Sequence, residues 1–403
     1  MSGFPHGGAW VPLTQKGAPS GVAALSSTGA VLSALVSGST AVGVGALAAD
    51  TGGTSVAIGY QALNANVGGG TNTAIGYEAL WVATSGNDNT AIGAYAGREV
   101  TASQLTAIGS GAAQNGAGAG CTAIGYGALN VGCTGAGNTA IGELALQQNT
   151  TGASNIAVGN NALQANQTGT NSVAVGSAAL SKSTVGPNTA VGGSAMATAT
   201  TATRNTAVGQ NAMQYLTTGY TNSAVGDNAA GALTQGYYNV IVGCDALKTA
   251  TTGYDNVAVG VDTLTGLLGG NDNTAVGTYA GTGPSRSDGI VAGQFNTHIG
   301  ASSGPGNTSD PSYTTALGAL TSVIGSGSVA IGTDSTGAGA AALVADEIAI
   351  GTANHQVKLS NNATGTGSAA LGANCPATTT TAPYTWFKMT SSDGSTVYVP
   401  AWK

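Results

Sequence analysis

The chain has 403 residues, of which 67 are glycine and only 6% are charged. A helix-rich enzyme or a coiled coil needs charged residues and leucine on its helix faces, so this composition argues against both. Collagen is excluded because only 10 residues are proline, and the many β-branched residues argue against simple disorder. The chain has a net charge of −7, and its nine basic residues are scattered. The sequence therefore has no basic patch that would bind nucleic acid.

Residues 1–6 have neither a positive charge nor an apolar core, so no secretory signal is predicted. No stretch of about 18 apolar residues occurs, and we expect no membrane span. The four cysteines are too few for a disulfide scaffold and are interpreted as reduced thiols: Cys121, Cys133, Cys244 and Cys375. The first three do not share a column of the repeat described next, which argues against disulfides between coils.

A block reading Asn-Thr-Ala-Ile/Val-Gly-x-x-Ala-Leu recurs along most of the chain. Its glycine, called position 0 below, occurs fifteen times at steps of 16 or 17 residues. These glycines are Gly43, Gly59, Gly76, Gly93, Gly109, Gly125, Gly142, Gly159, Gly176, Gly192, Gly209, Gly226, Gly243, Gly260 and Gly277. Self-similarity at a fixed short period indicates a repeat architecture in which each block forms one structural unit.

The columns next to this glycine have the chemistry of a β-strand. Position −1 is Ile or Val in all fifteen repeats, and position −2 is Ala in all but one, where Ile241 replaces it. β-branched residues favour strands, and side chains alternate across a strand, so Ile/Val must face one side and the flanking Ala and Gly the other. We expect Ile/Val to fill the core and the bare Ala/Gly side to form an apolar stripe, approached closely by the backbone of another chain.

The remaining columns predict how each block closes. Gly is usual at position −7 and Asn at position −4, and both residues accept the left-handed dihedrals of turns. A column of Asn can also bond from coil to coil. One strand of about five residues, a turn, a second short strand and another turn account for the period, which predicts an all-β fold, a parallel β-solenoid (β-roll). Fifteen coils about 4.8 Å apart give a rod of roughly 70 Å.

Tyrosines recur in register in two places. Tyr220, Tyr237 and Tyr254 occupy position −6 in three successive repeats, and Tyr60 and Tyr77 occupy position +1 in two. If the coils lie in register, each set stacks. The stack is either a stripe for sugar rings or a ladder that only stabilises the fold, and we favour the second interpretation.

Carboxylates also share columns. Asp245 and Asp262 occupy position +2, and Asp255 and Asp272 occupy position −5. Like charges on adjacent coils repel, so either a bound cation such as Ca²⁺ or solvent must stabilise them. We favour a solvated acidic edge, because no coordination loop of defined spacing is present.

No constellation of catalytic residues is found. The three histidines, His6, His298 and His355, lack zinc-binding spacing, and we expect the last two in turns or on the surface. The chain has no Gly-x-Ser-x-Gly elbow with a matched histidine and no phosphate-binding loop that ends in Gly-Lys-Ser/Thr. Its glutamates lie in different columns, which leaves paired carboxylates for polysaccharide cleavage unsupported. We therefore predict no catalytic residue, no cofactor and no metal.

Residues 55–59, 171–176 and 328–332 resemble the head repeat of the trimeric autotransporter adhesins, the YadA-like head. The resemblance covers about 41–281 and extends loosely to 351. It implies a left-handed parallel β-roll formed by three chains together, so we expect a homotrimer, either intertwined or side by side. The repeat itself argues only for association. The signal peptide, coiled-coil stalk and membrane barrel of those adhesins are not expected here.

The ends of the chain resemble bacteriophage tail fibres. Residues 16–31 are similar to a short segment near the start of tail-fibre shafts, and 346–355 to the closing turn of such fibres. Residues 385–389 and 396–402 resemble the small C-terminal hairpin of phage structural proteins, with the turn at 391–394. We therefore predict a virion attachment segment (1–40), a regular YadA-like shaft (41–281), an irregular continuation with loops (282–374) and a C-terminal hairpin tip (375–403). Gly318, Gly325 and Gly332 are seven residues apart, which indicates that the winding tightens or changes there.

The expected function is that of a non-enzymatic tail fibre of the virion, assembled in the host cytoplasm. Its expected partners are two further copies of itself, a phage tail or baseplate protein at the N-terminal segment, and a host surface glycan or protein. The candidate receptor-binding residues are Tyr220, Tyr237, Tyr254, Trp386, Phe387, Tyr398 and Trp402.

Three alternatives stay open: a polysaccharide-degrading tailspike, a bacterial surface adhesin, and ice binding by the Thr row at position −3. The last is the weakest, because Thr alternates with Val, Ile and Ser in that row, and because the row shares a face with the Ile/Val expected in the core.

Overall fold

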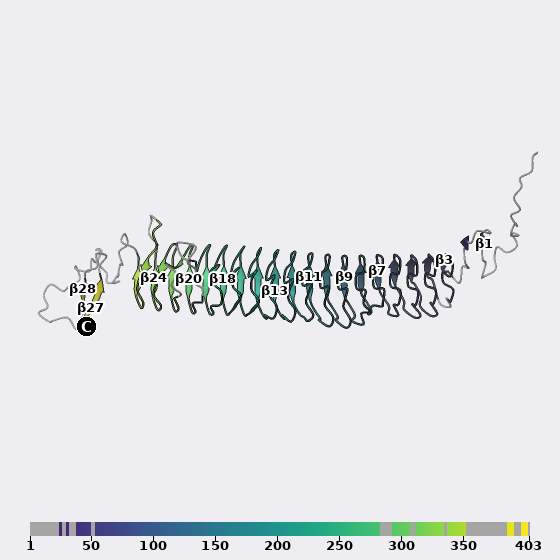
Figure 1. Cartoon of the computed structure of the whole chain (residues 1–403), viewed down its shortest axis with the longest axis horizontal. Helices are drawn as coiled ribbons and strands as arrows, with labels where there is room; N and C mark the ends of the chain where they lie inside the picture. Colours follow the sequence, from purple (N-terminus) through teal and green to yellow (C-terminus); the bar gives the residue numbers. More distant parts are fainter. Residues whose placement is uncertain are drawn as a thin grey trace, which may run out of the picture.

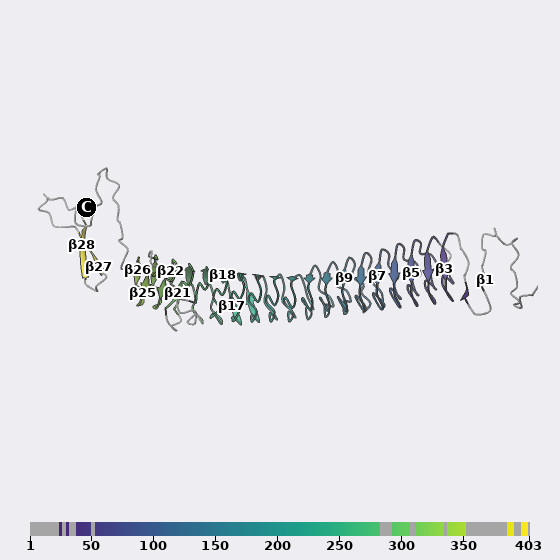
Figure 2. The same ribbon diagram turned by 90° about the horizontal axis from the view of Figure 1, so that it is seen from above.

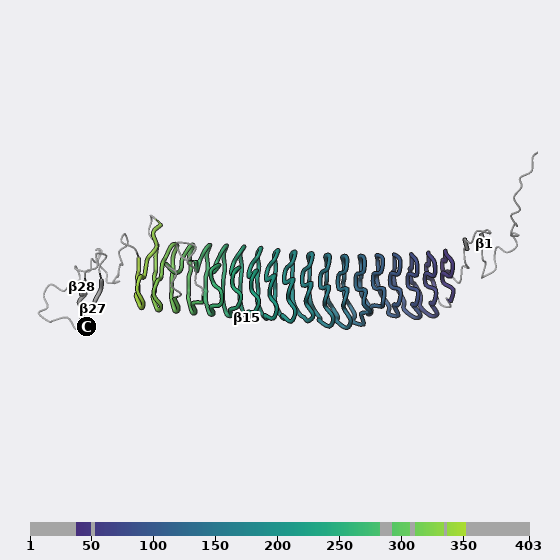
Figure 3. The backbone as a smooth tube through the Cα atoms, viewed as in Figure 1, coloured from purple at the N-terminus to yellow at the C-terminus, as the bar shows by residue number. Residues whose placement is uncertain are grey.

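The chain forms an elongated all-β rod, seen as a ribbon in Figure 1 and as a tube in Figure 3. The computed structural model describes residues 24–25, 30–31, 38–49, 53–282, 292–306, 311–333, 337–351, 385–390 and 396–401. Within these residues there is no helix, and the strands of the rod are parallel. The predicted parallel β-solenoid is therefore confirmed.

One sheet of nineteen short strands runs along the rod (Figures 1 and 2). Its strands are β3 (Thr40–Val42), β4 (Val56–Ile58), β5 (Thr73–Ile75), β6 (Thr90–Ile92), β7 (Thr106–Ile108), β8 (Thr122–Ile124), β9 (Thr139–Ile141), β10 (Ile156–Val158), β11 (Val173–Val175), β12 (Thr189–Val191), β13 (Thr206–Val208), β14 (Ser223–Val225), β16 (Val240–Val242), β18 (Val257–Val259), β19 (Thr274–Val276), β20 (Thr297–Ile299), β22 (Thr315–Leu317), β24 (Val329–Ile331) and β26 (Ile348–Ile350). Each strand pairs with the next one in the same register, so equivalent residues lie over one another.

Four smaller sheets complete the described strands. β15 (Gln235–Tyr237) pairs in parallel with β17 (Thr252–Tyr254), and β21 (Gly304–Pro305), β23 (Ser322–Val323) and β25 (Ala341–Ala342) form a second parallel sheet. β1 (Ala24–Leu25) pairs antiparallel with β2 (Ala30–Val31), and β27 (Thr385–Thr390) with β28 (Thr396–Ala401). The expectation of a five-residue strand and a second strand in every coil is wrong, because main-sheet strands have three residues and most described coils close through turns. The turn at 391–395 lies outside the described residues, so the C-terminal hairpin stays a prediction.

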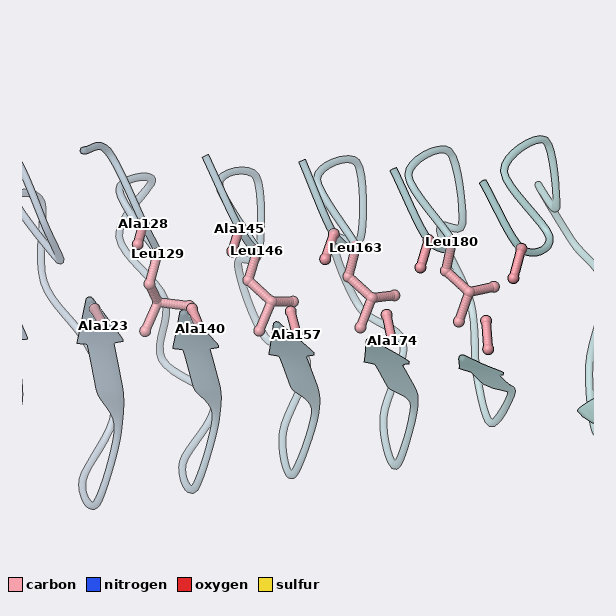
Figure 4. Packing of buried hydrophobic residues seen from close by; sticks show 14 of the residues in the cluster. Ala123, Ala128, Leu129, Ala140, Ala145, Leu146, Ala157, Leu163, Ala174 and Leu180 are labelled. Atoms are coloured by element: carbon pink, nitrogen blue, oxygen red, sulfur yellow. The ribbon is translucent and has the colours of Figure 1, made fainter. Parts of the chain in front are cut away.

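The facing of the strand is the reverse of the expected one. The central Ala of most strands, such as Ala157 or Ala174, is fully buried, whereas the residues on either side of it are half-buried or exposed. Figure 4 shows why: Leu146 and Leu163, at position +4, extend from the opposite wall of the coil toward the strand alanines. A coil of two walls has room for a large side chain from one wall only, so the strand wall must be small.

The wall that carries these leucines has an unusual backbone. Leu63 has a φ of 49° and Gln61, two residues earlier, has a φ of 55°. The Gln61 N–H donates to the Val44 carbonyl of the preceding coil at 2.9 Å, and the Leu63 N–H donates to the Ala79 carbonyl of the following coil at 3.0 Å. Bonds to both neighbouring coils therefore stabilise a left-handed conformation that leucine otherwise avoids.

The Asn column forms the predicted ladder from coil to coil. Asn239 is buried; its amide Nδ2 donates to the Gly253 carbonyl and to Asn222 Oδ1, each at 2.9 Å, and its backbone N–H donates to that same Oδ1 at 3.1 Å. A buried amide left without partners costs about 1–3 kcal/mol, so the ladder keeps a polar column inside a thin core. The left-handed residue of this corner is not the Asn but the one before it, for example Tyr238 with a φ of 58°.

The solenoid continues beyond the regular shaft. β20, β22, β24 and β26 extend the main sheet past residue 282, although 283–291 lie outside the described residues. Thr315 pairs with Val329, so this coil has 14 residues, whereas Val329 pairs with Ile348 and the next coil has 19; the winding therefore changes here, as predicted. Gly325 lies between these strands and is not a strand glycine.

Candidate functional site: the outer sheet face and the tyrosine ladder

The outer face of the main sheet is a continuous feature that runs along the described rod. Positions −3 and −1 of its nineteen strands point outward, and none of them carries a charged side chain. The side chains of Val225 and Val242, on adjacent strands, are 41% and 39% exposed. Isolated apolar residues are normal on a protein surface, whereas a continuous row of them marks an interaction surface.

Two sequence interpretations change with this facing. The close backbone approach at position 0 is made by the next coil of the same chain, because a Cβ on Gly192 would meet the carbonyl of Gly209. Alanine therefore lines the interior of each coil and not a seam between chains. The Thr row at position −3 lies on the outer face and not on the core side as expected, although Val, Ile and Ser still interrupt it.

The tyrosine ladder forms as predicted, in the coils that contain β15 and β17 and in the coil before them. The ring centroids of Tyr220 and Tyr237 are 5.1 Å apart and those of Tyr237 and Tyr254 are 4.8 Å apart, with interplanar angles of 5° and 2°. Both faces of the Tyr237 ring are therefore covered by its neighbours. A sugar ring cannot stack on that side chain, and only the outer faces of the end rings and the ring edges are left.

Tyr238 belongs to this cluster and was missed by the sequence analysis. Its ring meets those of Tyr220 and Tyr237 edge to face, at 5.4 and 5.6 Å between centroids, and its side chain is 51% exposed. It occupies position −5, a column that otherwise holds mainly Asp, Thr and Gly, so no periodic signal marked it. We call Tyr220, Tyr237, Tyr238 and Tyr254 the tyrosine cluster.

A second aromatic cluster lies nearer the N-terminus of the rod. Tyr60 and Tyr77 stack as predicted, with centroids 5.1 Å apart and planes 14° apart, and Tyr95 meets Tyr77 edge to face at 5.2 Å. On the same coils the Arg98 guanidinium lies over the Trp81 ring at 4.5 Å. It also pairs with Glu78 and Glu99 at 2.8 and 2.9 Å, so each of these three charged side chains has an oppositely charged partner.

The C-terminal candidates are placed only by backbone pairing. In the β27–β28 register, Trp386 lies opposite Pro400, Phe387 opposite Val399, and Tyr398 opposite Lys388. Trp402 lies outside the described residues. The structure thus brings the ladder tyrosines together and leaves the role of the C-terminal aromatic residues a prediction.

A lysine occupies the place considered for a cation. Lys248 Nζ is 3.3 Å from Asp245 Oδ2 and 3.4 Å from Asp262 Oδ1, so one ammonium bridges the two carboxylates. Partial burial lowers the pKa of Lys248, but the hydrogen bonds and charges of the two aspartates outweigh it and leave this pKa above its usual value. Within the described residues, no group of three or more His, Cys, Asp or Glu side chains could hold a metal ion.

His298 contradicts the prediction of a turn or surface position. It takes the place of the strand alanine in β20, between Ala275 and Ala316, and is buried. The Thr314 hydroxyl donates to Asn296 Oδ1 at 2.6 Å, so it accepts the proton of His298 Nε2 at 2.9 Å. His298 Nδ1 then has no hydrogen-bond partner. His6 and His355 lie outside the described residues.

Comparison with known proteins adds no identification. No protein-family model, no curated protein and no solved structure matches this chain. In the part of the chain that the structure describes, no helix is both long and apolar enough to cross a membrane.

Proposed function

We propose that this protein is a non-enzymatic tail fibre of a bacteriophage, in which three rods associate side by side and bind the host surface. The observation that carries the proposal is the uncharged outer face of the main sheet. The core of each coil is filled by its own leucines and alanines, so this face has no partner within the described part of the chain. Association would remove its Ile and Val side chains from water, at roughly 25 cal/mol per Å² of apolar area buried.

Side-by-side association fits the sheet better than intertwining does. Every strand of the main sheet pairs with neighbouring coils of its own chain, so each rod closes without a strand from another copy. The number three and the virion setting come from the resemblance to adhesin heads and phage fibres. A fibre needs length and rigidity, and in-register coils supply both because each one rests directly on the next.

Charges on this face are expected to separate the chains. The double variant V225K/V242E places opposite charges on adjacent strands, so the two new side chains do not repel each other within a single rod. Association would bury both charges in the interface between rods, which costs their hydration free energy. We expect sedimentation velocity to show a trimer for the natural protein and at least tenfold weaker association for the variant. L268D is the matched control, because the Leu268 side chain is 47% exposed outside the sheet face.

Circular dichroism must show that the double variant retains its β structure. A natural protein that sediments as a monomer at micromolar concentration would contradict the trimer. In that case the exposed Thr and Ile/Val array makes ice binding the second candidate function. A test of ice recrystallisation with the monomer then decides it.

The tyrosine cluster is our candidate for part of the host contact, through Tyr238 and the free ring edges. Replacing Tyr238 by alanine is expected to weaken binding of the purified protein to host cells at least fivefold. It should change thermal stability little, because the stack of Tyr220, Tyr237 and Tyr254 stays intact. Y126A is the control, since Tyr126 is 63% exposed and lies in a distant coil. Equal binding by both variants would remove the cluster from the receptor site and leave the C-terminal segment as the candidate.

Enzymatic cleavage of the host polysaccharide is the alternative with a direct assay. A tailspike would release reducing ends from purified host polysaccharide, whereas we expect none from this protein. A bacterial adhesin would instead be found on intact cells that carry no phage particle.

A further inference from the structure

Two cysteines converge on one carbonyl in the interior of the rod. Cys121 Sγ lies 3.4 Å from the Gly135 carbonyl oxygen, and Cys133 Sγ lies 3.3 Å from the same atom. The two sulfur atoms are therefore no farther apart than the sum of these distances. Both residues belong to one coil and both are buried. The mismatch of columns that argues against disulfides between coils does not apply within a coil.

An asparagine pair two coils further along the rod shows that these positions face each other. Asn155 Nδ2 and Asn166 Nδ2 both donate to the Gly169 carbonyl, at 2.7 and 3.1 Å. Cys121 occupies the ladder position of Asn155, and Cys133 lies within one residue of the position of Asn166. The two thiols thus replace two amides that point at one acceptor, and unlike the amides they can be joined covalently.

We propose that Cys121 and Cys133 form a disulfide within this coil by exchange with a small disulfide such as oxidised glutathione. One thiolate attacks a glutathione sulfur and releases a glutathione thiolate, and the second thiolate then attacks the mixed disulfide and releases the other. Two protein thiols are oxidised, one glutathione disulfide is reduced to two thiols, and the two protons pass to the glutathione thiolates. The product is a covalent cross-link between residues 121 and 133 of the same coil.

The folded environment makes the exchange slow. Burial, followed by the nearness of Cys121, raises the pKa of Cys133 to about 11, and burial raises the pKa of Cys121 as well. Few thiolates are then present at neutral pH, so the bond forms during folding or through local opening. Once formed, it stabilises the fold, because it restricts the unfolded chain.

The test compares the equilibrium of this bond in the folded and the unfolded chain. The variant C244S/C375S keeps only the two cysteines of interest, and circular dichroism verifies its fold. Reduced and oxidised chains are refolded separately in the same mixture of reduced and oxidised glutathione until the two samples agree. Alkylation and mass spectrometry then give the fraction of intramolecular disulfide, and a parallel sample in urea gives the value for the unfolded chain.

We expect the effective concentration of one thiol toward the other to be at least tenfold higher in the folded protein. By linkage, the disulfide then raises the equilibrium constant for folding by that same factor. If the effective concentration in the folded chain were equal to or below that in the unfolded chain, the proposal would be overturned, because the fold would then hold the sulfurs apart. The single-cysteine variant C133S/C244S/C375S serves as the control, since it cannot form an intramolecular disulfide.

Discussion

Replacing Gly192 by alanine is expected to lower the free energy of unfolding by about 4 kcal/mol. Gly192 has a φ of 136°, which residues with a side chain rarely adopt, and an added Cβ would lie under 3.0 Å from the backbone of Gly209. Backbone cannot rotate away as a flexible side chain can, so adjacent coils would have to separate. Urea denaturation followed by circular dichroism measures the loss.

The adjacent glycine supplies the matched control. Gly193 has an ordinary backbone conformation, and an added Cβ there would meet nothing within 4 Å. We expect G193A to change stability by about 0.5 kcal/mol or less, because it adds a methyl group in open space. If the two variants were equally stable, the stacking of coil on coil at position 0 would be wrong.

The period of the sequence was sufficient to predict the solenoid and its register. Identical columns at steps of 16 or 17 residues can lie over one another only if each block makes one coil. The stacks of Tyr60 with Tyr77 and of Tyr220 with Tyr237 follow directly from that register. The Asn ladder follows in the same way, because Asn222 and Asn239 have equivalent neighbours.

The facing of the strand could not be taken from the strand alone. Alternation shows that Ala and Ile/Val point to opposite sides, but it does not show which side is the interior. The size of the opposite wall decides it: Leu at position +4 fills the coil and leaves space only for Ala on the strand. That signal was present in the sequence as a Leu or Met column, and weighing it against the Ala column would have given the correct facing.

The left-handed conformation of the leucine wall had no comparable signal. Leu146 has a φ of 50° and Leu163 has a φ of 50°, in a region that sequence reasoning assigns to Gly and Asn. Hydrogen bonds to the coils on both sides outweigh this local preference, and those bonds exist only once coils have stacked. Likewise, Tyr238 joins the tyrosine cluster through a turn whose shape no propensity predicts.

The burial of His298 was hidden by an interruption of the period. The regular glycines end at Gly277, and the next equivalent glycine is Gly300, beyond residues 283–291. Counted from Gly300, His298 occupies position −2, the column of buried alanines. If one longer step is allowed between the glycines at position 0, the sequence repeat places this histidine in the core.

Acid is expected to weaken the C-terminal part of the rod through this histidine. Burial lowers the pKa of His298 to about 4 from an ordinary value of 6.5, and no charged group contributes to the shift. The unfolded chain therefore binds the proton more readily, so the contribution of His298 to stability is complete above pH 6.5 and is lost as the pH falls toward 4. The full loss amounts to about 3 kcal/mol.

Hydrogen exchange resolved along the chain is the measurement, because coils of a solenoid open near the site of destabilisation. Between pH 6.5 and 4, after correction for the intrinsic exchange rate, protection should fall around β20 and β22 more than around β5 and β6. The variant H298A restores the alanine of the column and should remove this difference, although it leaves all carboxylates in place. Such a result would assign the acid sensitivity to protonation at Nδ1, the ring nitrogen for which the core supplies no partner. If protection in H298A fell with pH in parallel with that of the natural protein, the role of His298 would be contradicted and the carboxylates would be implicated instead.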